Sequence, residues 1–132
     1  MEPTTLIYRR ERFNLQAVVV TTQEGLIVTL TGGDRSHVGS VVLAEARPSQ
    51  GEPWRYSTTA SVLNRLGHQD EAVARPLAEL LAQAWGKPVV VIAGVHWDLP
   101  GTIAPERLRQ LQTEVQQLGQ DILRGRDEAK LQ

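Results

Sequence analysis

Residues 88–94 of the chain read Pro-Val-Val-Val-Ile-Ala-Gly, a continuous apolar run with proline at one end and glycine at the other. A short run of this kind, rich in β-branched residues, is typical of a strand that is buried on both faces, because a half-buried strand alternates between apolar and polar residues. The sequence therefore predicts the central strand of a sheet here.

Apolar residues with the spacing of one face of a helix occur both before and after this strand in the sequence. Before it, an apolar face ends at Gly86-Lys87-Pro88, and Pro76 lies inside the pattern. We expect either a regular helix that begins close to Pro76 or a kink at that residue, because proline removes one backbone donor. After the strand, Thr102 and Pro105 predict the start of a second helix, whose polar tail from Gly125 should fray. The two apolar faces are Val73, Leu77, Leu80, Leu81 and Ala84, then Leu108, Leu111, Val115, Leu118 and Ile122.

The first half of the chain predicts four strands. Arg12–Thr22 is rich in β-branched residues and alternates, and the alternation resumes after a short turn, from residue 26 to residue 30. A third strand at Val38–Ala46 is expected to end at residues 47–53, whose two prolines and one glycine cannot continue a ladder. Tyr56–Leu63 is the fourth.

The element order β-β-β-β-α-β-α predicts an α+β fold of two layers, a mostly antiparallel sheet with both helices on one face. We expect a single domain over residues 1–132, with an ordered core from about residue 6 to residue 124 and a polar tail at residues 125–132. The other face of the sheet needs a cover, and we expect a homodimer. The apolar residues expected on that face are Val18, Val20, Ile27, Val41 and Val42.

The composition excludes several classes of function. The net charge is −1 with acidic and basic residues intermixed, so there is no basic stripe and we expect no nucleic-acid partner. The chain has no cysteine, which excludes a disulfide framework, a thiolate zinc site and a cysteine nucleophile. No run approaches the roughly 20 apolar residues that cross a bilayer, and residues 1–5 lack a basic and apolar leader. We expect a soluble cytoplasmic protein without a membrane partner.

All three histidines lie in or beside glycine-containing turns. The turns read Gly-Gly-Asp-Arg-Ser-His-Val-Gly at residues 32–39, Gly-His-Gln-Asp-Glu at residues 67–71 and Gly-Val-His-Trp-Asp at residues 94–98. Glycine lets the backbone bend at the ends of strands and helices, where binding groups are usually found. If the fold brings these turns together, they form one polar site of imidazoles, carboxylates and backbone amides.

Each turn also has an ordinary structural interpretation. Residues 31–39 could direct backbone amides and the Arg35 guanidinium toward a phosphate, or they could form a long hairpin loop. Asp70 could cap a helix, with Glu71 at the positive end of the helix dipole. His96 follows the buried strand, and polar groups at such a strand end are more often functional.

Metal binding stays open as an alternative, and nucleophilic catalysis is not indicated. The histidines together with Asp34, Asp70 or Asp98 match the ligand types of zinc and non-haem iron, although no His-x-x-x-His spacing is present. No serine lies in a Gly-x-Ser-x-Gly elbow.

Several separated motifs, in order along the chain, resemble the small prenylated-flavin chaperone family, the LpdD-like proteins that accompany UbiD-type decarboxylases of gallate and other hydroxyarylic acids. The resemblance runs from about Phe13 to Leu118. The motifs lie at residues 32–44, 47–49, 57–62, 67–71, 74–75 and 93–98.

The resemblance implies a dimeric α+β fold like that of the proteasome assembly chaperones, and a carrier role without catalysis. Such a carrier binds reduced prenylated flavin mononucleotide, the product of a flavin prenyltransferase, and hands it to an apo-decarboxylase. Flavin mononucleotide needs a phosphate cradle, a flat surface for its ring and polar contacts to the ring edge. The residues that we assign to these tasks are Gly33, Arg35, Ser36, His37, Arg47, His68, His96, Trp97 and Asp98.

The three tryptophans divide by position. Trp54 and Trp97 could stack on a planar ring, whereas Trp85, on the last turn of the first helix, is expected to pack in the core or at an interface. Two other functions remain open beside the carrier: a module that assembles protein subunits without a small ligand, and a metal-dependent enzyme with histidine ligands.

Overall fold

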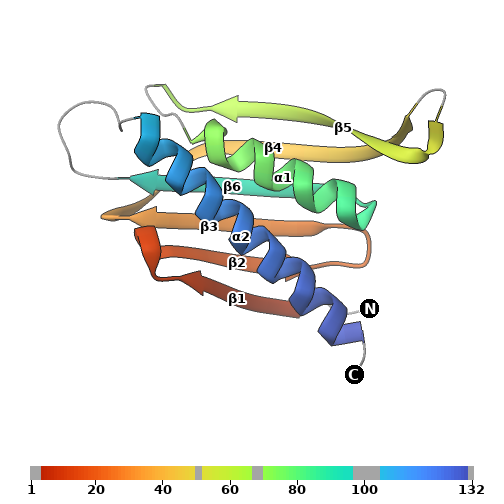
Figure 1. The fold of residues 1–132 in the computed structure, drawn as a ribbon, viewed down its shortest axis with the longest axis horizontal. Coiled ribbons are helices and arrows are strands. Elements are labelled where there is room, and N and C mark those ends of the chain that lie inside the picture. Colours follow the sequence, from red (N-terminus) through yellow and green to blue (C-terminus); the bar gives the residue numbers. More distant parts are fainter. Residues whose placement is uncertain (1–3, 50–51, 67–69, 97–104, 131–132) are drawn as a thin grey trace.

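The computed structural model describes residues 4–49, 52–66, 70–96 and 105–130, which form one six-stranded sheet and two helices (Figure 1). The sheet has the order β1-β2-β3-β6-β4-β5, with β3 and β6 parallel and the other neighbouring pairs antiparallel. The predicted α+β class is confirmed. The elements are β1 (Thr4–Arg10), η1 (Arg12–Asn14), β2 (Leu15–Thr21), β3 (Leu26–Gly33), β4 (Arg35–Ser49), β5 (Glu52–Asn64), α1 (Glu71–Trp85), β6 (Val89–His96) and α2 (Pro105–Lys130).

The apolar run at residues 89–93 lies in β6, between β3 and β4, so the predicted central strand is confirmed. It is not equally buried on its two faces. Val89, Val91 and Ala93 are fully buried against the helices, whereas Val90 and Ile92 are only half-buried on the opposite face. The continuous apolar pattern therefore reflects one covered face and one apolar face that no described element covers.

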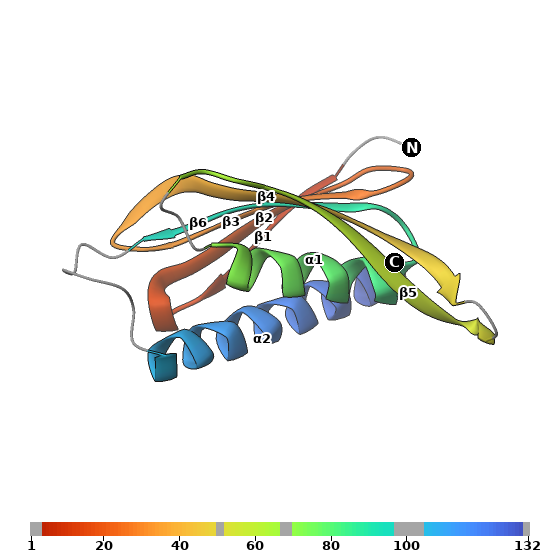
Figure 2. The same cartoon turned by 90° about the horizontal axis from the view of Figure 1, so that it is seen from above.

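Both helices lie against the same face of the sheet, as predicted (Figure 2). Side chains alternate along each strand between this covered face and what we call the open face. Val42 was expected on the open face, but it is buried under the helices and its neighbour Val41 faces the other way. By register, the apolar residues of the open face are Ile7, Val18, Val20, Ile27, Val41, Leu43, Leu63, Val90 and Ile92.

Pro76 lies inside α1, which runs from Glu71 to Trp85 as one helix rather than beginning near the proline. A proline at this position cannot donate to the carbonyl of Ala72, four residues earlier. That carbonyl instead accepts a hydrogen bond from Gln112 Nε2 of α2, at 3.0 Å. The second helix thus satisfies the group that the proline leaves open.

The sheet has one more strand than the sequence predicted, because β1 pairs with β2 along its whole length. It is an edge strand, and Leu6 and Ile7 are 46% and 55% exposed, so little apolar burial marks it in the sequence. The predicted break at residues 47–53 is also too long, since β4 continues to Ser49 and β5 begins at Glu52. A register shift at Pro48 and Ser49 accommodates the proline there.

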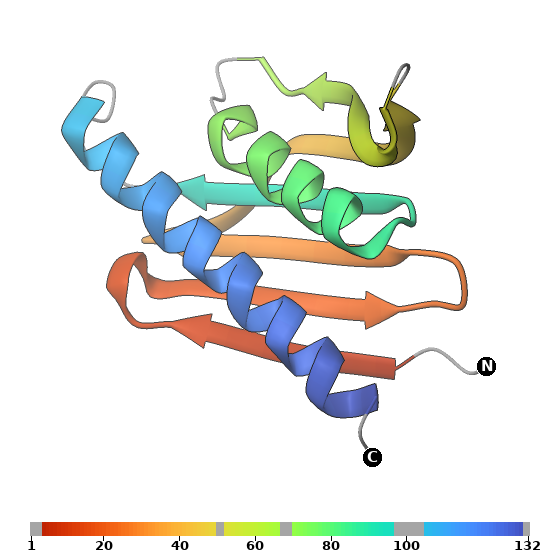
Figure 3. The same ribbon diagram turned by 45° about the vertical axis from the view of Figure 1, so that its right-hand side comes forward.

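α2 continues to Lys130, through the residues from Gly125 that were expected to fray. Gly125 lies against Tyr8 of β1, and a Cβ there would overlap the tyrosine hydroxyl. This glycine is therefore explained by close packing on β1 rather than by the end of a helix. Figure 3 shows α2 running diagonally across the sheet toward β1.

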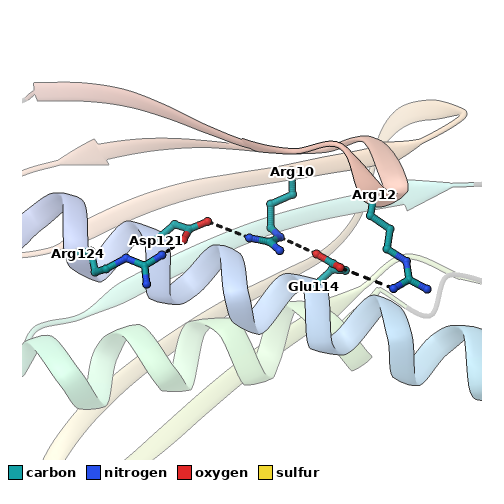
Figure 4. A network of polar contacts seen from close by, with 5 residues as sticks. All are labelled: Arg10, Arg12, Glu114, Asp121 and Arg124. Atoms are coloured by element: carbon teal, nitrogen blue, oxygen red, sulfur yellow. Dashed lines mark hydrogen bonds and ion pairs between the residues drawn. The ribbon is translucent and has the colours of Figure 1, made fainter.

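Charged side chains fasten α2 to the β1 end of the sheet (Figure 4). Arg10 lies between Glu114 and Asp121, with nitrogen–oxygen distances of 2.6 and 3.2 Å. The hydrogen bond with Glu114 raises the pKa of the Arg10 guanidinium, against the opposing effect of burial, and the charges of Glu114 and Asp121 add to it. Arg12 and Arg124 extend the network at its two ends.

Within the described residues, no helix has both the length and the apolar character needed to cross a membrane.

Candidate functional site

One end of the sheet collects the ends of several elements (Figure 1). Here β3, β5 and β6 end, while β4, α1 and α2 begin. Four polar side chains from three distant segments of the chain meet there: Arg35, His37, Asp70 and His96. We call these four residues the histidine cluster.

The chain wraps around the end of β6 at His96. Gly33 of β3 pairs with His96 on one side, and Arg35 of β4 pairs with it on the other. Asp34 alone joins the two strands, and its backbone N–H donates to the His96 carbonyl at 2.6 Å. Gly33 has φ +74°, and a Cβ there would overlap the His96 carbonyl oxygen, so the turn requires glycine.

This wrap excludes the hairpin interpretation of residues 31–39. β3 and β4 are not hydrogen-bonded neighbours, because β6 lies between them. The segment is instead the end of β3 and the beginning of β4. Its polar residues are therefore fixed on both sides of β6.

A bulge in β4 places His37. Ser36 pairs with Val95 and Ser40 with Ala93, so three residues of β4 lie opposite Gly94 alone. Two glycines give this bulge its room: a Cβ at Gly94 would overlap the His37 carbonyl oxygen, and a Cβ at Gly39 would overlap a carboxylate oxygen of Asp70. Bulges commonly redirect a side chain beside a functional site, and this one brings His37 to α1.

Asp70 connects the bulge to β6 and α1. Its Oδ2 lies 3.1 Å from His37 Nε2, and its Oδ1 accepts a hydrogen bond from the Val95 N–H at 2.8 Å. Asp70 is buried, with 7% of its surface exposed. It stands at the N-cap position of α1, but its side chain makes no capping hydrogen bond. The side-chain cap expected from the sequence is therefore wrong, because both carboxylate oxygens are directed at other groups.

The two histidine rings are in edge-to-face contact, with centroids 5.3 Å apart and planes at 86°. Arg35 approaches His96 Nε2 with a guanidinium nitrogen at 2.9 Å. A guanidinium can only donate, so His96 Nε2 accepts and the ring proton of neutral His96 is on Nδ1. The cluster thus combines a cation, two imidazoles and a buried carboxylate.

The end of β5 holds the bulge from the other side. Arg65 donates from its backbone N–H to the Gly39 carbonyl and from its guanidinium to the Val38 carbonyl, at 2.9 and 3.0 Å. Asn64 accepts from the buried Ser40 hydroxyl and donates to Glu71 at 2.7 Å. Sequence reasoning missed Asn64 and Arg65, because only the pairing of β4 with β5 brings them to the cluster.

The structure does not bring Arg47 to the cluster. It lies near the other end of β4, where its Nε donates to Thr59 Oγ1 at 3.3 Å. At about 3.3 Å per residue, the separation from Arg35 along the strand is on the order of 30 Å or more. Trp85 packs against the core at the end of α1, with the Lys87 ammonium over its ring. Its expected packing role is confirmed.

Three of the predicted site residues, His68, Trp97 and Asp98, lie outside the described residues. Ser36 lies in β4 opposite Val95, and Gly33 lies beside His96. Among the residues that the structure describes, no group of three or more histidine, cysteine, aspartate or glutamate side chains is arranged to hold a metal ion.

Comparison with known proteins gives a family and a fold. A family model described as the prenylated flavin chaperone LpdD-like domain matches residues 9–126. Among solved structures, a chain from a chaperone complex for yeast 20S proteasome assembly matches with a TM-score of 0.61 and 14% sequence identity, over 95% of this chain and 98% of that chain. At this identity the likeness shows the fold alone. No curated protein matches the chain.

Proposed function

The chain belongs to the family of prenylated flavin chaperone LpdD-like domains, whose model spans residues 9–126 of 132, and from this premise we propose that it binds reduced prenylated flavin mononucleotide and loads it into a UbiD-type decarboxylase. Membership in a chaperone family supports a role without catalysis of its own. The absence of cysteine from the sequence supports a location in the reducing cytoplasm.

The convergence of Arg35, His37 and His96 at one end of the sheet is the observation that carries this proposal. A guanidinium has five N–H donors and suits a phosphate group. The imidazole of His96 can exchange hydrogen bonds with the polar edge of a flavin ring. These are the contacts that the phosphate and ring edge of flavin mononucleotide require.

The apolar part of the ligand has a surface beside the cluster. Ile92 and Val41 are paired on the open face. Ile92 is four residues from His96 along β6 and Val41 is six residues from Arg35 along β4, and by register His96 and Arg35 share that face. Both side chains are half-buried. We propose that the prenyl ring of the cofactor contacts this apolar surface, so that prenylated flavin binds more tightly than ordinary flavin mononucleotide.

We further propose that the protein is a homodimer joined through the open face. A soluble monomer rarely exposes a contiguous apolar patch larger than a few hundred Å². The register aligns two rows of side chains across all six strands, apolar along most of their length, as a self-complementary interface would need. The central row is Thr5, Val20, Ile27, Val90, Leu43 and Ser61. The other row is nearer the histidine cluster, so that the prenyl ring would contact it at the border of the interface, and consists of Ile7, Val18, Thr29, Ile92, Val41 and Leu63.

The carrier is tested by co-expression with a flavin prenyltransferase, anaerobic purification and transfer to an apo-decarboxylase. We expect the purified protein to show a flavin absorbance spectrum and to raise the yield of active decarboxylase in proportion to the flavin it carries. His96→Ala should abolish that gain with a nearly unchanged thermal transition. Turnover of hydroxybenzoates by the isolated protein, or full delivery by His96→Ala, would contradict the carrier.

Arg35→Ala should weaken flavin binding by about ten- to a hundredfold, because a charge-assisted contact to phosphate contributes roughly 1.5–3 kcal/mol. Titration of each variant with reduced prenylated flavin measures this. Arg109→Ala, which removes an exposed arginine of α2, is the control for loss of positive charge. Arg47→Ala separates the two arginines proposed from the sequence: weaker binding by this variant and not by Arg35→Ala would move the phosphate to the opposite end of β4.

A further inference from the structure

Asp70 uses its two carboxylate oxygens for two different partners. Its Oδ1 accepts from the Val95 N–H at 2.8 Å, while its Oδ2 faces His37 Nε2 at 3.1 Å. The two side chains are 6% and 15% exposed, so solvent does not replace these partners. We infer that Asp70 is a positioning residue of the histidine cluster, one that fixes the orientation and the tautomer of His37.

The chemistry of the donors and acceptors sets that tautomer. A carboxylate oxygen accepts, so His37 Nε2 donates and the lone pair of the neutral ring is on Nδ1. His96 has the opposite arrangement, because Arg35 can only donate to its Nε2. Two rings in edge-to-face contact at 5.3 Å therefore hold opposite tautomers, each set by a charged neighbour.

The contact between Asp70 and His37 replaces a side-chain cap at the start of α1. An aspartate at the N-cap position ordinarily accepts from the first backbone N–H groups of its helix, and Asp70 gives up that contact. Gly39 supplies the space for the carboxylate, since a Cβ there would overlap Asp70 Oδ2. An aspartate that does not cap its helix departs from the usual local preference, and such departures are expected at functional sites.

The role in ligand binding rests on the flavin site proposed above. Nε2 of His37 faces Asp70 and Nδ1 is buried, so His37 acts on a ligand through the position of its ring against His96 and not through a direct hydrogen bond. Asp70 would then shape the ligand site through His37, without touching the ligand itself.

Asp70→Asn tests the inference at nearly constant volume. The amide has one oxygen, and if that oxygen keeps the Val95 N–H, the amide NH₂ faces His37 Nε2 and donates to it. The proton of the imidazole must then move to Nδ1. Long-range ¹H–¹⁵N spectra of the neutral form should show His37 as the Nε2–H tautomer in the wild type and as the Nδ1–H tautomer in Asp70→Asn, with the resonances assigned from His37→Asn.

We also expect Asp70→Asn to lower flavin affinity by at least about tenfold, the effect of one charge-assisted hydrogen bond. Glu71→Gln is the matched control, because it removes the adjacent negative charge, whose partners are Asn64 and Arg75. It should leave both the tautomer and the affinity unchanged.

An Nδ1–H tautomer in wild-type His37, an unchanged tautomer in Asp70→Asn, or an unchanged affinity would each overturn the inference. The wild-type spectrum decides the assignment even if Asp70→Asn does not fold. It also needs no ligand, so a wild type that takes up no flavin would refute the proposed function separately from the tautomer.

Discussion

The histidine cluster requires glycine at three positions, because a Cβ at any of them would overlap an atom of the cluster. Gly33 adopts a left-handed conformation against the His96 carbonyl, and Gly94 admits the His37 carbonyl. Gly39 admits the carboxylate of Asp70. At the scale of the residue, the cluster therefore depends on the absence of Cβ atoms as much as on its polar groups.

Gly39→Ala should destabilise the fold and separate His37 from Asp70, because the new Cβ occupies the position of Asp70 Oδ2. Overpacking of this kind costs about 1–3 kcal/mol, and denaturant unfolding measures it. The matched variant is the double mutant with Asp70→Ala, in which the carboxylate is already gone. The cost of Gly39→Ala should be smaller in that background, and an equal cost in both would place the strain elsewhere.

The sequence predicted part of this cluster. It indicated that the histidine turns would meet, and the structure brings His37 and His96 together. It did not reveal that Asp70 contacts His37, because an aspartate before a helix is explained by capping alone. It grouped Arg47 with Arg35, because the length and course of β4 are not visible in composition. The Asp70 contact depends on which strands are neighbours, and the distance between the arginines depends on the length of one strand. A single sequence states neither.

At the scale of the element, α1 contains a proline and still forms one helix. The carbonyl of Ala72, which Pro76 leaves without its helical donor, accepts from Gln112 of α2. Gly119 of α2 also lies close to Leu77 and Leu80 of α1. The proline was visible in the sequence, but its compensation is on another helix, so the sequence alone favoured a late start or a kink.

Gln112→Ala should destabilise the protein by about 1–3 kcal/mol, because it leaves the carbonyl of Ala72, in a partly buried position, without a donor. In a Pro76→Ala background, the new backbone N–H can donate to Ala72, and the cost of Gln112→Ala should be smaller. A double-mutant cycle by chemical unfolding measures the difference. Additive effects of the two substitutions would show that Gln112 does not compensate for the proline.

The remaining elements show what periodicity can and cannot give. Both helices, the central strand and the α+β class follow from apolar spacing. β1 does not, because an exposed edge strand buries few side chains. The end of α2 does not either, because Gly125 is fitted to Tyr8 and not to a helix terminus.

At the scale of the whole molecule, the polar cluster lies at one end of the sheet and the apolar open face lies across its middle. Ile27 and Leu43 are 43% and 40% exposed in the single chain, on opposite sides of β6. Both flank Val90 by register. These positions are central in the proposed dimer interface.

Ile27→Asp and Leu43→Asp should each convert the proposed dimer to a monomer, since a charge at the centre of an apolar interface is left without a partner. Size-exclusion chromatography with light scattering measures the mass in solution. Leu66→Asp is the control, because Leu66 is 99% exposed and lies two residues beyond the end of β5. Wild-type protein that is already monomeric, or variants that stay dimeric, would exclude the open face as the interface.

The order β3-β6-β4 also has a consequence for how the chain folds. During synthesis, the residues of β1 to β5 leave the ribosome before those of β6, and β3 and β4 have no ladder with each other. Until β6 emerges, the nascent chain holds two separate pieces of sheet, which only a strand made later can join. Such long-range closure is entropically costly and slows folding. His96, the last residue of that strand, therefore reaches its place only when β6 has joined the two pieces, and ligand binding at the cluster would report that the sheet has been completed.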